Sequence, residues 1–61
     1  MEVRIVELLS GRLVGEFPVF ISAENYTPTE REYFDLAWRC AIEDGLVKPE
    51  CRVEYHFSMT A

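Results

Sequence analysis

The stretch of residues 27–45 constrains the fold more than any other part of the sequence, because it carries signals for both ends of one helix. Thr27, Pro28 and Glu30 match the capping pattern in which the Thr hydroxyl and the Glu carboxylate each accept a backbone N–H at the start of a helix. Gly45 can adopt the left-handed conformation that commonly ends a helix. The sequence therefore predicts a helix that begins at Thr27, runs through Asp44 and stops at Gly45.

The segments on both sides of this helix have the patterns of strands. Residues 2–9 are rich in β-branched side chains and meet turn residues at Ser10 and Gly11. In residues 13–21 the odd positions are mostly apolar, but Gly15 and Pro18 interrupt the run, which is typical of a bulged or edge strand. Residues 51–59 alternate between apolar odd positions and polar even positions. We therefore expect three strands, with the second at an edge.

The order strand, strand, helix, strand predicts a two-layer ββαβ domain of the α+β class. Its sheet would be three-stranded and mainly antiparallel, in the order 2-1-3, with the helix packed on one face. The alternative order places the third strand beside the second, parallel to it through a right-handed crossover. Pro18 and Gly15 favour the first order, because a strand with these residues is a poor central strand. A chain of 61 residues forms one domain, so residues 1–61 are expected to be a single unit.

The predicted helix and sheet both have more apolar surface than a monomer of this size needs. Apolar side chains occupy an arc of about 240° on the helical wheel, against the roughly 100° stripe of a helix buried on one side. If Val3, Ile5, Phe17, Val19, Val53, Tyr55 and Phe57 face the helix, the opposite face of the sheet also collects apolar residues. Contiguous apolar patches mark interaction sites in soluble proteins. We therefore predict an interaction surface on the helix flank and the outer sheet face, formed by Tyr33, Leu36, Trp38, Cys40, Ile42, Val6, Leu8, Val14, Phe20 and His56.

The sequence has no motif for catalysis, metal binding or cofactor binding. His56 is flanked by Glu54 and Ser58, but residues two apart on a strand are too far from each other for a catalytic triad. Cys40, Cys51 and His56 lack the paired ligand spacing of a zinc site. No glycine-rich phosphate loop is present. We therefore expect no enzymatic activity, no metal and no cofactor.

The charge balance bears on partners and compartment. Eleven acidic residues against six basic ones give a net charge of -5, which opposes binding to nucleic-acid phosphates. No stretch approaches the ~20 apolar residues of a membrane span, and the first residues do not resemble a signal peptide. We therefore expect a cytoplasmic protein without membrane contact, with Cys40 and Cys51 reduced; a disulfide between them would require export.

These observations favour a protein that works by protein–protein association, as a homodimer or as an accessory or regulatory subunit. One alternative is a small-ligand-binding protein or an enzyme with a pocket between helix and sheet, lined by Tyr33, Tyr55, Trp38 and His56. Another is a single-stranded nucleic-acid binder that uses Arg4, Arg52 and aromatic side chains on the open sheet face.

Overall fold

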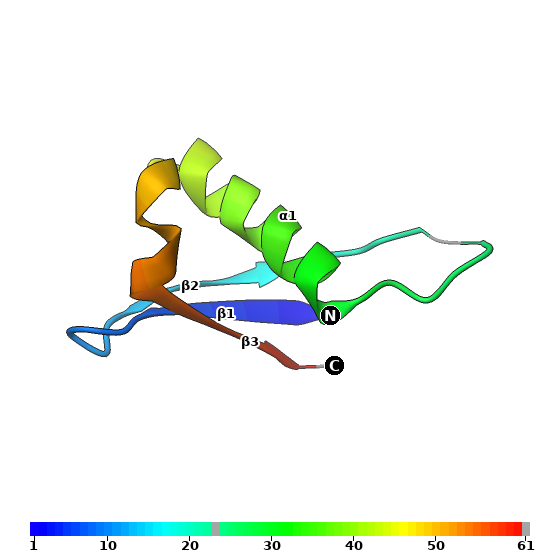
Figure 1. Cartoon of the computed structure of the whole chain (residues 1–61), viewed down its shortest axis with the longest axis horizontal. Coiled ribbons are helices and arrows are strands. Elements are labelled where there is room, and N and C mark those ends of the chain that lie inside the picture. Colours follow the sequence, from blue (N-terminus) through cyan, green and yellow to red (C-terminus); the bar gives the residue numbers. More distant parts are fainter. Residues whose placement is uncertain (23, 61) are drawn as a thin grey trace.

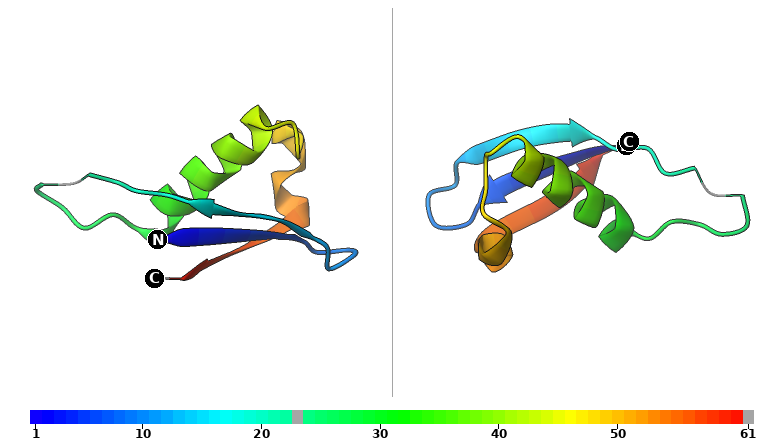
Figure 2. Two further views of the ribbon diagram at one scale, coloured as in Figure 1. Left: turned by 180° about the vertical axis from the view of Figure 1, so that it is seen from behind. Right: turned by 90° about the horizontal axis from the view of Figure 1, so that it is seen from above.

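The computed structural model describes residues 1–22 and 24–60 and has two layers, a helix on a sheet. The elements in chain order are β1 (Glu2–Glu7), β2 (Leu13–Pro18), α1 (Glu30–Glu43), the 3-10 helix η1 (Pro49–Glu54) and β3 (Tyr55–Thr60). The strand order is β2-β1-β3, and β1 is antiparallel to both neighbours. Helix α1 crosses one face of this sheet (Figures 1 and 2). The predicted fold class, strand order and placement of the helix are confirmed.

A β-bulge in β2 decides which of its side chains face the helix. Ile5 is opposite Gly15 and Val6 is opposite Leu13, so Val14 is an extra residue in β2 without a partner of its own. Val14 consequently packs against the core, whereas Leu13 is exposed on the face away from the helix. The sequence correctly predicted a bulged edge strand, but the assignment of Val14 to the outer face was wrong. A strict period of two does not continue through a bulge.

The helix begins two residues later than the capping pattern at Thr27 indicates. Thr29 is the N-cap: the Glu32 N–H donates to Thr29 Oγ1 (3.4 Å), and the Thr29 N–H donates to Glu32 Oε2 (3.2 Å). This is the same reciprocal pattern, shifted along the chain to the next Thr and Glu pair. At the other end, Gly45 has φ +72° and its N–H donates to the Ile42 carbonyl (3.0 Å), as the sequence predicted.

The third strand is shorter than the alternating pattern of residues 51–59 indicates. Pro49 opens η1, which occupies residues 49–54, and β3 begins only at Tyr55. Figure 1 shows η1 descending from the level of α1 to the level of the sheet. The segment kinks at Cys51 (φ -100°, ψ 15°) and carries the chain from the helix layer to the sheet (Figure 1). Val53 therefore lies in the descending segment and is exposed instead of facing the helix.

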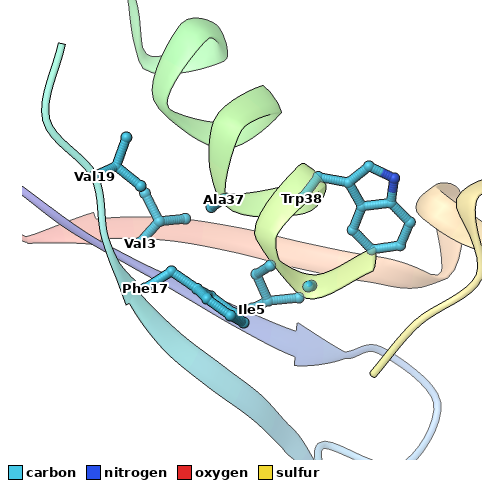
Figure 3. Packing of buried hydrophobic residues seen from close by; sticks show 7 residues of the cluster. Val3, Ile5, Phe17, Val19, Ala37 and Trp38 are labelled. Atoms are coloured by element: carbon cyan, nitrogen blue, oxygen red, sulfur yellow. The ribbon is translucent and has the colours of Figure 1, made fainter. Parts of the chain in front are cut away.

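The core lies between α1 and the inner face of the sheet. Val3 and Ile5 from β1 are fully buried, Phe17 and Val19 come from β2 and the residue after it, and Ala37, Trp38 and Ala41 come from α1 (Figure 3). The small Ala37 and Ala41 let the helix backbone approach β1 closely. Trp38 extends toward β3, with its ring centroid 5.2 Å from that of Tyr55 and 5.8 Å from that of Phe57. This core is small, as the length of the chain predicted.

Candidate interaction surface

The clearest concentration of exposed apolar side chains lies where β1 ends, β2 begins and η1 meets β3. Leu9 is 98% exposed and Val53 is 87% exposed, and Leu8 and Leu13 in the adjoining hairpin are exposed as well. The Leu8 N–H donates to the Glu54 carbonyl (2.9 Å), which holds the hairpin loop against the end of η1. We name the group formed by Leu8, Leu9, Leu13 and Val53 the hairpin-end patch.

Local structure explains why these side chains are exposed. The hairpin loop is closed by two backbone hydrogen bonds, from Glu7 N–H to the Arg12 carbonyl (2.9 Å) and from Gly11 N–H to the Glu7 carbonyl (2.8 Å). This loop lies beyond the end of α1 on the sheet, so nothing from the helix layer covers Leu8 and Leu9 (Figure 2). An open hollow of about 320 Å³ is lined by Leu8, Leu9 and Glu54. The patch is thus a mostly apolar surface with a carboxylate at its margin.

The helix residues of the predicted surface pack against the core to a larger extent than expected. Tyr33, Leu36, Cys40 and Ile42 are all half-buried and contact the buried cluster. Trp38 is only 5% exposed and belongs to the cluster itself. The placement of Trp38 on a surface flank does not hold in this structure, because its ring fills the space between α1 and β3. The wide apolar arc of the helix is largely used within the monomer.

The outer face of the sheet is mixed in character. Val6 is half-buried and lies opposite His56 of β3, which is exposed. On the same face, Arg4 forms an ion pair with Glu16 of β2 (3.0 Å). Phe20 is 85% exposed, but it follows β2 at the far end of the sheet, where the connection to α1 projects from the domain (Figure 1). Phe20 is therefore separated from the hairpin-end patch by the length of the sheet.

Leu9, Leu13 and Val53 were not among the residues predicted for the interaction surface. Val53 was expected to face the helix, and η1 changes its surroundings. Leu13 was one of the apolar odd positions of the second strand, and the bulge places it on the outer face. Signals for both changes exist in the sequence: Gly15 indicates a bulge, and Pro49 can begin a helical turn. Leu9 was assigned to the end of a strand, whereas the structure places it in the hairpin turn.

The residues proposed for a ligand pocket do not come together. Trp38 and Tyr55 pack against each other on the inner face, while His56 points to the outer face. The arginines proposed for nucleic-acid binding are also separated. Arg4 lies on the outer face, whereas Arg52 lies on the helix side, where it forms an ion pair with Asp35 (2.5 Å) and stacks over the Phe57 ring (5.2 Å).

The two cysteines are free thiols, each half-buried. A hydrogen bond with the Glu54 side chain raises the pKa of the Cys51 thiol, and partial burial and the negative charges of Glu54 and Glu50 raise it further. A thiol with a raised pKa is a poor nucleophile at neutral pH. Among residues 1–22 and 24–60, no three His, Cys, Asp or Glu side chains lie close enough together to hold a metal ion.

Neither helix in the described part of the chain has the length and apolar character needed to cross a bilayer. Comparison of the chain with protein-family models, curated proteins and solved structures gives no match. The residues of the hairpin-end patch and of the sheet are therefore the basis for the functional inference.

Proposed function

We propose that this protein acts by protein–protein association, as a homodimer or as an accessory or regulatory subunit, and that the hairpin-end patch is a contact surface. The observation that carries the proposal is the extreme exposure of Leu9 and Val53 at the end of the sheet where Leu8 and Leu13 are also exposed. Single exposed apolar residues are normal on protein surfaces, but Leu8 and Leu9 line one hollow together with Glu54, and grouped apolar side chains mark a site of interaction.

The energetics indicate what kind of contact the patch supports. Burying a fully exposed Leu or Val side chain contributes about 1.5–3 kcal/mol, so the four side chains of the patch provide at most roughly 6–12 kcal/mol. Association costs about 4–15 kcal/mol in lost translational and rotational freedom. The patch alone therefore supports weak or transient binding, and a stable complex needs additional contacts from the same protein.

The chemistry of the described residues points in the same direction. Cys51 has a raised pKa, and within the described part of the chain the His56 side chain forms no hydrogen bond with an acidic or nucleophilic side chain. An apolar surface without an adjacent reactive group is suited to binding another protein.

The proposal is tested by measuring solution mass and partner capture with a patch variant. The variant Leu9→Ser/Val53→Ser removes the two most exposed apolar side chains of the patch, and Phe20→Ser is the matched control at the far end of the molecule. Light scattering on a size-exclusion column is run over a range of concentrations with reductant present. In parallel, each immobilised protein is exposed to extract of the source cells and the retained proteins are identified by mass spectrometry.

We expect the wild type and Phe20→Ser to self-associate or to retain the same protein, and the patch variant to lose that contact. Far-ultraviolet circular dichroism checks that all three proteins are folded. A wild-type mass of 7.1 kDa at every concentration, together with identical retained proteins for wild type and patch variant, would refute the proposal.

A further inference from the structure

The backbone hydrogen bonds determine which groups of β3 remain free at the edge of the sheet. The Leu8 N–H bonds to the Glu54 carbonyl, and bonded pairs alternate along an antiparallel ladder, so His56 and Ser58 use their backbone groups toward β1. Phe57, which lies between them, and Met59, which follows Ser58, direct their N–H and carbonyl groups away from β1. The Tyr55 carbonyl also points outward, whereas the Tyr55 N–H already donates to the Arg52 carbonyl.

The opposite edge, formed by β2, is protected against an added strand. The Val19 N–H bonds to the Met1 carbonyl, so the alternation places the outward-directed positions of β2 at Glu16 and Pro18. Pro18 has no N–H to offer, Glu16 adds a charge, and the bulge at Val14 distorts the strand. Proline, charge and bulges are the features by which proteins block edge strands.

Strand β3 has none of these protections. Its sequence Tyr-His-Phe-Ser-Met-Thr contains no proline, glycine, acidic residue or lysine, whereas β1 and β2 both contain charged residues. β3 is the terminal strand of the sheet, and the left view in Figure 2 shows it along one margin. Unprotected edges of this kind pair with another strand.

We propose that β3 pairs antiparallel with β3 of a second copy of the chain, so that two sheets join into one; this inference rests on the proposed function of protein association. The outward-directed groups are symmetric about Phe57. In a two-fold arrangement centred there, each Phe57 N–H meets the Phe57 carbonyl of the other copy, and each Met59 N–H meets the Tyr55 carbonyl of the other copy. The occupied Tyr55 N–H is not needed for any of these bonds.

The symmetry and the charge favour a second copy over an unrelated peptide. A strand that matches itself under two-fold rotation forms an isologous interface, the commonest kind among homodimers. The chain has a net charge of -5, yet the paired strands would place no like charges opposite each other. The antiparallel arrangement would also leave the two hairpin-end patches at opposite ends of the dimer, free for a further partner.

A proline at an outward-directed position tests this edge. Met59→Pro removes an N–H that is not used within the monomer and should block the added strand. Glu16→Pro makes the same change at an outward position of β2 and is the matched control. By light scattering at one concentration, we expect wild type and Glu16→Pro to have twice the 7.1 kDa monomer mass and Met59→Pro to have the monomer mass.

A disulfide trap decides the question independently of how well Met59→Pro folds. In the proposed register, His56 lies opposite Ser58 of the second copy at a non-hydrogen-bonded pair, where Cα atoms are about 4.5 Å apart. The variant His56→Cys/Ser58→Cys, made with Cys40→Ala and Cys51→Ser, should form a disulfide-linked dimer on mild oxidation. The corresponding pair Glu2→Cys/Arg4→Cys on the central strand should not.

The outcomes separate this inference from the proposed function. A dimer that persists in folded Met59→Pro, or no crosslink through residues 56 and 58, would overturn pairing through β3 while leaving association through the hairpin-end patch intact. A wild type that is monomeric at all concentrations would also overturn it, and capture of a partner through the patch would then still support the proposed function.

Discussion

Replacing Trp38 with alanine is expected to remove most or all of the stability of the fold. The side chain is 5% exposed and fills the space between α1 and β3, with its ring against Tyr55 and Phe57 at centroid distances of 5.2 and 5.8 Å. Phe34 of the helix also contacts Phe57, with ring centroids 5.4 Å apart, but Trp38 pairs with both Tyr55 and Phe57. Its loss would leave a cavity that the short β3 cannot close by a small shift.

The magnitude follows from core substitutions and from the size of the domain. Truncating a buried Trp to Ala costs about 3–5 kcal/mol, a range that includes aromatic pair contributions of about 0.5–1.5 kcal/mol each. At about 0.05–0.15 kcal/mol per residue, a chain of 61 residues has a total free energy of unfolding of roughly 3–9 kcal/mol. The expected loss is therefore comparable with the entire stability.

Urea unfolding followed by far-ultraviolet circular dichroism measures this loss, because Trp38 is the single tryptophan and its fluorescence disappears with it. Trp38→Phe should lose less than Trp38→Ala, since a smaller ring still contacts Tyr55 and Phe57. Leu9→Ala, at a 98% exposed position, is the control and should change the free energy of unfolding by less than about 0.5 kcal/mol. A loss below about 1 kcal/mol for Trp38→Ala, combined with a changed solution mass, would show that Trp38 acts at an interface and not in the core.

Three further predictions concern single sites. Thr29→Ala should lower the free energy of unfolding by about 1 kcal/mol in urea titrations and Thr27→Ala should hardly change it, because Thr29 is the N-cap; equal losses would contradict this assignment. Gly45→Ala should cost about 1–2 kcal/mol and lower the Tm in thermal unfolding, because an L-residue is strained at φ +72°, and an unchanged Tm would count against that strain. Glu54→Gln should lower the pKa of Cys51, because it weakens the hydrogen bond to the thiol and removes a negative charge. In a Cys40→Ala background, the rate of Cys51 alkylation by iodoacetamide should therefore rise at a given pH near 8. An identical pH profile of alkylation with and without Glu54→Gln would disprove the role of Glu54.

The fold was predictable because its signals are local and agree with one another. Alternation at Val3, Ile5 and Phe57 marks the inner face of the sheet, and Gly45 marks the end of the helix. The choice of N-cap was less determined, because Thr27 with Glu30 and Thr29 with Glu32 satisfy the same capping pattern. The capping pattern does not separate the two pairs, and the structure uses the second.

The interaction surface was harder to predict because it depends on departures from regular periodicity. The bulge at Val14 turns Leu13 outward, and η1 removes Val53 from the strand. Trp38 was misplaced for a different reason. Helical periodicity gives the direction in which a side chain leaves the helix. Whether other residues bury that side chain depends on how α1 packs over β3. These are tertiary properties, and a helical wheel contains no information about them.

Strand β3 connects the stability of the monomer to its proposed association. The side chains of Tyr55 and Phe57 pack under Trp38, while the backbone groups of Phe57 and Met59 face the open edge. Pairing of the edge would hold the same residues that close the core, so dimerisation should stabilise the fold by mass action, by about 2.7 kcal/mol at a hundredfold excess over Kd. The Tm of wild type should then rise with protein concentration, and the Tm of Met59→Pro should not. The small core and the unprotected edge of β3 are therefore linked, because a second copy would supply contacts that the short chain cannot form by itself.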